Sequence, residues 1–471
     1  MKLTILGGAG VRTPLFIQSI LRLSRDIAID EVSLMDPDTD KLNLIELVVR
    51  EVVSRAGNPF NVKFSSNPRD AIAGADFVVS AIRVGGLPGR VIDETVPLRH
   101  GVIGQETTGP GGFCMGLRTI PVMLEYVRMI KDLAPKAWLI NFTNPSGMIT
   151  QAITSYGEMN RVIGVCDGPA AMFHKLATAL DIDSSRAYFD YFGLNHLGWL
   201  RGIYVDGEEI LTGILGRLDN SLVKQRLEGL HEVAMFGMDL LKALHMIPNE
   251  YLYYYYYNRE ALEHVRSAGE TRGQFLVRTT EELMGRLHAA RAAGDPVRAV
   301  EEYNRYIETR RRMYMRIETG TDLNEDLAPR GAGATEESDT GESGGYEHIA
   351  LEIIRAIMLN LKQTMVLNTK NGGVIEGLGP DSVVELPCAA DSSGVHPLAV
   401  GEVPKEALGL MQIVKEYEKL TIDASVTGSY LTAWKALTIH PLVPSAGVAR
   451  EILDEYLDQH GETLAHIRRQ A

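Results

Sequence analysis

Two apolar runs of the sequence each end in side chains that could do chemistry. Cys166 and Asp167 follow the run "RVIGV", and Gly168 with Pro169 comes directly after them, which indicates a turn. His196 lies thirty residues further on in "YFGLNHLGWL", where a predicted strand again gives way to a loop. A thiolate and an imidazole can bind a metal ion, and a carboxyl group beside them can donate or accept a proton. Taken singly, a cysteine or histidine of this kind is more often a buried structural residue.

Phenol groups are concentrated in the run "YLYYYYYNRE" at 251–260. At helical spacing Tyr251, Tyr254 and Tyr255 share one face, and Tyr253 and Tyr257 share another. A tyrosine has an ordinary pKa of about 10, so one that acts as a base needs a metal ion or an arginine to lower its pKa. The spacing alone does not select one tyrosine, and most of this run is expected to form core or wall.

Strands and helices alternate through the first part of the chain. Apolar runs that end in polar or glycine-rich residues predict strands, whereas apolar residues at helical spacing predict the helices between them. This alternation predicts an α/β fold with a parallel, doubly wound sheet over residues 1–195. The predicted strands are "KLTILGG", "EVSLMD", "ADFVVSAIR", "AWLINFTNP" and "RVIGVCDGP", and the predicted helices include "PLFIQSILRLSRDI" and "KLNLIELVVREVVSRAG".

The remainder, 196–471, is predicted to form a C-terminal α+β domain that contributes to substrate binding and oligomer contacts. The segment "GLNHLGWLRGIYVDGEEI" predicts antiparallel strands with a turn at Asp206-Gly207. Helical patterns follow over about 220–320 and over the last seventy residues. Residues 331–345 are poor in apolar side chains and rich in glycine, serine and acid, which predicts a loop.

The N-terminal stretch "ILGGAGVRTP" follows a predicted strand and opens a predicted helix, which is the context of a dinucleotide phosphate loop. Glycine lets the backbone approach a pyrophosphate whose charge then lies at the helix N-terminus. Asp36 ends the next strand, where a carboxylate can accept hydrogen bonds from the ribose hydroxyls and favours NAD over NADP. The alternative is a strand–turn–helix without a ligand, because Thr13 stands where the third glycine is expected. The predicted cofactor loop comprises Gly8, Gly10, Val11, Arg12 and Thr13.

The composition limits the classes of partner that the chain can bind. Its 471 residues carry a formal net charge of −14, which argues against nucleic-acid and anionic-membrane partners. Cys114, Cys166 and Cys388 are odd in number and widely spaced, which indicates free thiols in a reducing compartment. The apolar run in "MKLTILGGAG" is too short for a signal peptide, and no apolar stretch of about 18 residues occurs. We therefore expect a cytoplasmic protein, and a few converging arginines could still bind a small anion.

Seven motifs follow one another along the chain. They are "IRVGGLPGRVIDE", "GVIGQETTGPGGF", "LINFTNPSGMITQA", "GVCDGP", "FGLNHLGW", "NEYLYYYY" and "YLTAWKALTIHPLV". In this order and spacing they resemble glycoside hydrolase family 4, and within it the 6-phospho-β-glucosidases, over nearly the whole chain. The resemblance implies bound NAD, a divalent metal that is usually manganese, and hydrolysis of 6-phospho-β-glucosides. The implied steps are oxidation at C3, deprotonation at C2, elimination of the aglycone, addition of water and re-reduction.

The same resemblance implies roles for individual residues. Cys166 and His196 match the metal ligands, and by motif position Tyr251 is the base, with Tyr254 next. Asp167 departs from the β-specific members, which usually carry asparagine there, and matches the aspartate that the phospho-α-glucosidases use as a proposed general acid. Three roles are open for Asp167: it protonates the leaving oxygen, it tunes the metal without binding it directly, or it caps the turn at Gly168. The preferred anomer therefore stays open. Glu106 matches a family glutamate close to the metal.

Polar residues at predicted strand ends are the candidates for substrate contacts. The amide of Asn144 in "FTNPSG" can bind sugar hydroxyls at the edge where ligands collect on such sheets. Arg83 and Arg90 in "IRVGGLPGR", together with Arg272, are candidates for a sugar phosphate, because guanidinium binds phosphate bidentately. Arg83 is also assigned to the cofactor. The acidic loop 331–345 would disfavour a phosphorylated substrate if it bordered the site.

Two function classes other than a glycosidase are also compatible with the sequence. A net NAD-dependent dehydrogenase would use the same loop but would accumulate NADH, and nothing in it requires Cys166 paired with His196. An inactive NAD-binding or scaffold protein would tolerate the loss of metal and base residues. A family member acting on α-linked or unphosphorylated glycosides is the alternative within the resemblance, which also suggests a homodimer or homotetramer.

Overall fold

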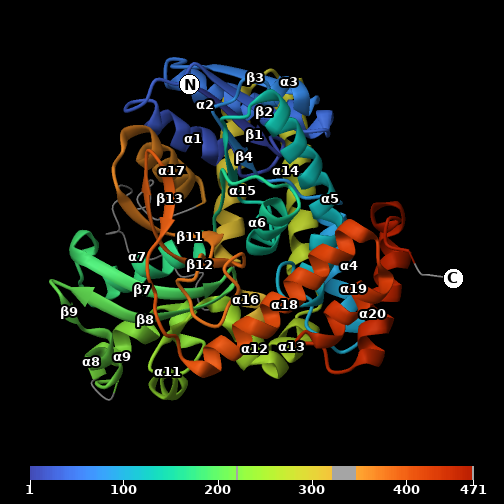
Figure 1. Ribbon diagram of the computed structural model, residues 1–471. Coiled ribbons are helices and arrows are strands. Elements are labelled where there is room, and N and C mark those ends of the chain that lie inside the picture. Colours follow the sequence, from blue (N-terminus) through green and yellow to red (C-terminus); the bar gives the residue numbers. More distant parts are fainter. Residues whose placement is uncertain (219–220, 314, 321–345, 469–471) are drawn as a thin grey trace.

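The computed structural model describes residues 1–218, 221–313, 315–320 and 346–468 (Figure 1). A parallel, doubly wound sheet forms its first part, with the strand order β3-β2-β1-β4-β5-β6. The helices between these strands have apolar faces that cover the sheet, which confirms the predicted fold class. The strands are β1 (Lys2–Leu6), β2 (Glu31–Met35), β3 (Asn61–Ser65), β4 (Phe77–Ser80), β5 (Trp138–Asn141) and β6 (Val162–Gly164).

The intervening helices follow the predicted pattern. The α1 and α2 helices correspond to the two helical patterns read from the sequence, whereas strand β3 was not predicted, because it is a partly exposed edge strand without a continuous apolar run. The helices of this part are α1 (Thr13–Leu23), α2 (Thr39–Arg55), α3 (Pro68–Ile72), α4 (Gly86–Arg99), α5 (Pro110–Leu133), α6 (Ser146–Ser155) and α7 (Gly168–Leu180).

The sheet continues beyond β6 with antiparallel strands from the second part of the chain. Strand β11 pairs with β6 through Asn368 and Gly164, and the order continues through β12, β7, β8 and β10. Residue 195 lies in the tight turn between β7 and β8, and both parts share one sheet, so the division into two domains stays a prediction. These strands are β7 (Ala187–Leu194), β8 (Leu197–Val205), β9 (Glu208–Glu209), β10 (Ile247–Pro248), β11 (Gln363–Lys370), β12 (Val383–Asp391) and β13 (Gly394–Pro397).

The tyrosine run does not form one continuous helix. A 3-10 turn, η2 (Glu250–Leu252), precedes the short helix α12 (Tyr253–Tyr256), and Asn249 caps η2 by accepting a hydrogen bond from the Tyr251 N–H at 3.1 Å. Neighbouring short elements are α8 (Leu211–Leu215), α9 (Ser221–Glu228), α10 (His231–Ala234), α11 (Met238–Leu244), α13 (Asn258–Ser267) and α16 (Arg316–Thr319).

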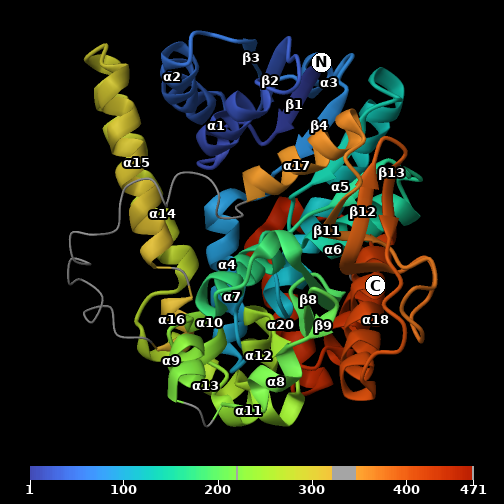
Figure 2. The same ribbon diagram turned by 90° about the vertical axis from the view of Figure 1, so that its left-hand side faces the viewer.

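A long helical hairpin of α14 (Arg272–Ala292) and α15 (Pro296–Arg312) reaches back to the N-terminal part. Figure 2 shows it extending to α2, and a separate apolar cluster joins the three helices. The cluster includes Leu44 and Val48 of α2 with Leu287 and Tyr303 of the hairpin. The Tyr303 hydroxyl also donates a hydrogen bond to the Val11 carbonyl at 2.8 Å. The hairpin therefore closes over the predicted cofactor loop.

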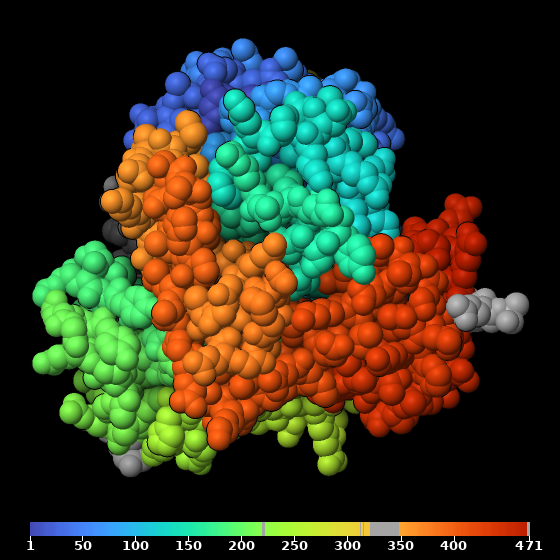
Figure 3. All heavy atoms as spheres, in the orientation of Figure 1, coloured from blue at the N-terminus to red at the C-terminus, as the bar shows by residue number. Residues whose placement is uncertain are grey.

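The C-terminal helices pack against the first part of the chain rather than standing apart (Figure 3). Buried Tyr417 of α18 donates to the Gly109 carbonyl at 3.1 Å, and Ser425 of the same helix donates to the Leu117 carbonyl at 3.0 Å. The predicted helical character of this region is confirmed by α18 (Lys405–Thr427), α19 (Tyr430–Ile439) and α20 (Ala446–His460), which follow α17 (Tyr346–Leu359). Within the described ranges, no helix has both the length and the apolar character needed to span a membrane.

Candidate active site

The glycine-rich loop after β1 folds tightly against β2 and β4. The N–H groups of Gly7 and Gly8 both donate to the Met35 carbonyl, at 2.9 and 2.7 Å. A Cβ on Gly8 would lie 2.9 Å from the Met35 nitrogen, so a side chain there would collide with backbone. Gly8 therefore allows a close approach of loop and strand, whereas Gly10 lines the adjoining cavity.

This cavity, about 830 Å³ in volume, extends from the glycine-rich loop to the end of β4. It is within the size range of small-molecule and cofactor sites. The α14–α15 hairpin supplies wall residues that the sequence did not single out, among them Thr280, Met284, His288 and Arg310. The predicted site residues that line it are Gly10, Val11, Arg12, Thr13, Arg83, Arg90, Glu106 and Asn144.

Asp36 lies behind the cofactor loop and does not line this cavity. Its carboxylate accepts hydrogen bonds from the Ala9 N–H at 3.1 Å and the Asp38 N–H at 3.0 Å, and burial raises its pKa. The aspartates on the cavity wall are instead Asp38, which caps α2, and Asp40 in the first turn of that helix. The proposed contact of Asp36 with ribose stays a prediction.

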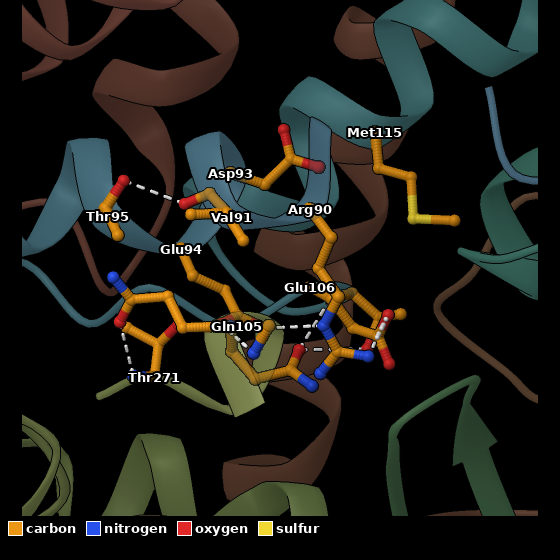
Figure 4. A network of polar contacts seen from close by, with 12 residues as sticks. Arg90, Val91, Asp93, Glu94, Thr95, Gln105, Glu106, Met115 and Thr271 are labelled. Atoms are coloured by element: carbon orange, nitrogen blue, oxygen red, sulfur yellow. Dashed lines mark hydrogen bonds and ion pairs between the residues drawn. The ribbon is translucent and has the colours of Figure 1, made fainter. Parts of the chain in front are cut away.

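Ion-paired arginines and glutamates form the inner end of the cavity, where Arg90 lies between Glu94 and Glu106 (Figure 4). Arg83 donates to Glu106 at 2.5 Å and Arg90 approaches the same carboxylate oxygen at 2.8 Å. Burial alone would raise the pKa of Glu106, but the two guanidinium groups lower it to about 2. The carboxylate is therefore charged throughout the physiological range, and it holds both arginines at the cavity wall.

Arg272 does not belong to this wall. It begins α14, and its guanidinium donates to the carbonyl oxygens of Met313 and Arg310 at 3.1 and 2.9 Å, which places it at the end of α15. Arg310 is the cationic residue of this region that lines the cavity. It comes from the basic run "RRR" of α15, and only the folding of the hairpin over the cavity distinguishes it from its neighbours.

Cys166, His196 and Tyr251 are a second set of predicted site residues, all of them buried, and none of them lines this cavity. The rings of His196 and Tyr251 are stacked with centroids 3.7 Å apart and an interplanar angle of 7°. Burial lowers the pKa of His196 to about 3, so the imidazole is neutral near pH 7. Burial, and then the charge of Glu385, raises the pKa of the Cys166 thiol.

The donor atoms of this group fit a divalent metal. The Nε2 atom of His196 is buried and has no hydrogen-bond partner among the described residues, which is costly unless something else occupies its lone pair. Its other ring nitrogen lies 2.8 Å from the Thr107 hydroxyl, and metal-binding histidines are held in this way through their second nitrogen. Cys166 would be the second protein ligand, as a thiolate, and sugar or water oxygens would suit the harder preference of manganese.

The two candidate tyrosines differ in their surroundings. Tyr251 is the one whose ring contacts His196. Tyr254 is fully buried, its hydroxyl donates to the Met315 sulfur at 3.6 Å, and burial raises its pKa far above the ordinary value. The geometry favours Tyr251 as the base, and both roles stay predictions.

Asp167 stands at the N-terminus of α7, where a carboxylate often caps the helix. Its side chain makes no hydrogen bond to the N–H groups of the first turn, so capping does not account for it. Asp167 lines a smaller cavity of about 80 Å³ together with Glu250, Lys175 and Glu232. The acidic loop 331–345 lies outside the described residues, so its proximity to either cavity stays a prediction.

A buried carboxyl group behind Cys166 was missed by sequence reasoning. Glu385 of β12 is 1% exposed and accepts hydrogen bonds from Asn368 at 2.9 Å, Asn195 at 3.1 Å and the Tyr191 hydroxyl at 3.0 Å. Asn195 directly precedes His196 and accepts from the Gly147 N–H at 3.3 Å. Glu385 thus anchors the β7–β8 turn that carries His196. The sequence shows only a single glutamate within an apolar strand, and this pattern predicts no particular role for it.

Replacing Glu385 with glutamine should flatten the pH dependence of stability. Burial raises the pKa of Glu385 from 4.5 to about 7, so the folded protein keeps a proton that the unfolded chain releases between these pH values. Stability is therefore lost as pH rises through this window. In chemical denaturation, the free energy of unfolding of the wild type should fall by roughly 2 kcal/mol relative to that of E385Q between pH 5 and 7.5. Parallel curves would contradict the prediction, and the exposed Glu263→Gln serves as control.

Comparison with known proteins places the chain among glycosyl hydrolases. The model described as "Family 4 glycosyl hydrolase" matches residues 2–182, and the "Family 4 glycosyl hydrolase C-terminal domain" matches 191–443. A probable 6-phospho-beta-glucosidase of Bacillus subtilis is 35% identical over 467 residues, which cover 98% of this chain and 96% of the relative.

Solved structures agree with this similarity. The 6-phospho-beta glucosidase of Thermotoga maritima with manganese, NAD+ and glucose-6-phosphate has 30% identity and a TM-score of 0.78, covering 97% of this chain and 98% of its own. A 6-phospho-alpha-glucosidase from gut microorganisms in complex with NAD and Mn2+ has 26% identity and a TM-score of 0.81, covering 98% of both chains. The backbone is thus shared by relatives of either anomeric specificity.

Proposed function

Because the chain belongs to the family 4 glycosyl hydrolases, we propose that it hydrolyses 6-phospho-β-glucosides with NAD and a divalent metal, manganese above all. One observation carries the proposal: a single cavity joins the glycine-rich loop to the cationic cluster of Arg83, Arg90 and Arg310. A dinucleotide on the loop and an anionic sugar at the arginines would therefore lie in contact. The β-glucosidase names of the relatives supply the anomer.

The residues divide the chemical work among them. When bound, NAD supplies a hydride acceptor that is restored in each turnover, and the metal stabilises charge on the sugar oxygens. Cys166 and His196 would hold the metal, and Tyr251, stacked on His196, would take the proton from C2 of the sugar. Arg83 and Arg90 stay in place because Glu106 binds both, and they orient the substrate.

Nitrophenol release tests this proposal. Reduced protein with NAD and Mn²⁺ is given the nitrophenyl β-glucoside 6-phosphate, its unphosphorylated counterpart and the α-linked phosphate. Rapid release from the phosphorylated β substrate without accumulation of NADH is expected. Stoichiometric NADH would instead indicate a net dehydrogenase, and release from the unphosphorylated compound alone would overturn the phosphate requirement.

One residue favours a second candidate, a 6-phospho-α-glucosidase. Asp167 matches the aspartate that the phospho-α-glucosidases carry as a proposed general acid, and it lines the smaller cavity beside Glu250. The same assay with Asp167→Asn separates the two candidates. If the enzyme is β-specific, D167N should retain most of its activity, whereas a selective loss of α-linked turnover would assign Asp167 as the acid of an α-glucosidase.

Two further properties complete the proposal. Three buried free thiols suit a reducing compartment, and we place the enzyme in the cytoplasm. We also expect a homodimer or homotetramer, which light scattering of the purified protein would test.

A further inference from the structure

The short loop between α4 and α5 carries an ordered chain of hydrogen bonds. The Oε1 atom of Gln105 accepts from the Thr107 N–H at 2.6 Å and from the Thr108 N–H at 2.7 Å. Backbone N–H groups can only donate, so the side-chain atom at this place is the amide oxygen. The Thr107 hydroxyl lies 2.9 Å from the same oxygen. An amide oxygen cannot donate, so the single hydroxyl proton of Thr107 points to Gln105.

The direction of the hydrogen bond from Thr107 to Gln105 determines the direction of the bond between Thr107 and His196. The Thr107 oxygen lies 2.8 Å from Nδ1 of His196. Since the hydroxyl proton is already directed to Gln105, this contact requires a proton on Nδ1, which the hydroxyl oxygen accepts. A neutral imidazole carries one N–H, so Nε2 then has a free lone pair. The unpartnered, buried Nε2 agrees with this tautomer, because an N–H there would be a donor without an acceptor.

Close packing keeps the loop in this arrangement. A Cβ on Gly104 would lie 1.8 Å from the Glu94 carbonyl oxygen, and one on Gly111 would lie 1.9 Å from the Gln105 carbonyl oxygen. The loop is thus pressed between α4 and the first turn of α5, and Gln105 is only 8% exposed. The stacked ring of Tyr251 fixes the plane of the imidazole from the other side.

We propose that Gln105 and Thr107 are positioning residues that hold His196 as the Nδ1–H tautomer, so that Nε2 is a preformed ligand for the metal. The inference rests on the proposed function for the metal-binding role of His196, but the tautomer itself does not. Neither residue contacts the substrate in this scheme. They act by presenting a lone pair at a fixed place before any ion arrives, which removes the cost of reorienting the ring.

The test compares Thr107→Val, which keeps the shape and removes the hydroxyl, with Thr107→Ser, which keeps the hydroxyl. The first readout is the tautomer of His196 in metal-free protein labelled with ¹⁵N-histidine, followed by long-range ¹H–¹⁵N correlation and assigned with His196→Asn. Wild type and T107S should show the Nδ1–H form, and T107V should show a mixture. The second readout is Mn²⁺ affinity by calorimetry, which should fall about 10–100-fold in T107V and about threefold or less in T107S.

Thr95→Val on α4 is the matched control, because within the described part of the chain the Thr95 hydroxyl donates only to the Val91 carbonyl of the same helix. It should leave tautomer and affinity unchanged. An Nε2–H tautomer in the wild type, or an unchanged tautomer and affinity in T107V, would overturn the inference. The expected tautomers would support the positioning role of Gln105 and Thr107 whether or not the protein hydrolyses phosphoglucosides. The tautomer measurement and the activity assay can therefore refute the two proposals independently.

Discussion

Tyr251→Phe should lower kcat on the β-glucoside 6-phosphate by about 10²–10⁴-fold, the usual contribution of a positioned general base. The substitution removes only the hydroxyl, and the ring can keep its stacking on His196. Binding of NAD and Mn²⁺ should therefore be unchanged, while proton removal becomes rate-limiting. A C2-deuterated substrate should then give a larger isotope effect on kcat in the variant than in the wild type.

Tyr254→Phe is the matched control for this prediction. The Tyr254 hydroxyl meets only a weak sulfur acceptor in a fully buried site, so its loss should change kcat about threefold or less. A large loss in Y254F with little effect in Y251F would exchange the roles of the two residues. Equal losses accompanied by lower thermal stability would indicate that the run is structural.

Arg118→Met should destabilise the protein by about 3–5 kcal/mol, the range seen when one member of a buried ion pair is removed. Arg118 of α5 binds Asp93 of α4 through both terminal nitrogens, at 2.6 and 2.7 Å, and both side chains are 0% exposed. Burial alone would raise the pKa of Asp93, but His460 and Arg118 lower it, so it is a charged carboxylate. The variant would leave that charge buried without its guanidinium partner.

The geometry also explains why this cluster is not a second metal centre. Asp93, Cys114 and His460 form the one group of three potential metal ligands found within the described residues. The Nη1 atom of Arg118 lies 2.6, 3.2 and 3.0 Å from their ligand atoms, so a guanidinium occupies the place that an ion would take. The cluster joins α4, α5 and α20.

Urea denaturation of R118M measures the effect, with Arg259→Met as control. Arg259 pairs with Glu263 on the surface of α13, where its side chain is 86% exposed, so that loss should cost about 0.5 kcal/mol or less. The double variant R118M/D93L, which removes both charges, should recover part of the loss. An unfolding midpoint for R118M equal to that of the wild type would contradict a stabilising role for the pair.

The elements of the N-terminal sheet followed from local sequence. Strands β1, β2 and β4 are short apolar runs, and α1 and α2 repeat apolar residues at helical spacing, so neighbouring residues carry the signal. The strand–turn–helix context of the cofactor loop is equally local. The motifs around Cys166 and His196 pointed to a metal pair through resemblance rather than spacing, since the two residues are distant along the chain.

Other parts depended on contacts between distant segments. Strand β11 pairs with β6, and α14 and α15 pack over α2. These contacts depend on which apolar faces pack together when the chain folds, and no local sequence pattern predicts them. For the same reason Arg310 was missed while Arg272 was selected, since the sequence around neither arginine shows where its side chain lies. Only the closed hairpin turns the first into the cavity and the second onto the carbonyl oxygens of α15.

The sequence by itself thus determined the fold class and the family, and it predicted the cofactor loop and the reactive side chains, because these depend on residue type and short-range order. Only the tertiary structure decided that Tyr251 stacks on His196, that Glu385 anchors the β7–β8 turn, and that Thr107 directs its oxygen at the imidazole. Hydrogen bonds require donor and acceptor within about 3 Å at the right angle. Such geometry exists only after distant segments have packed together.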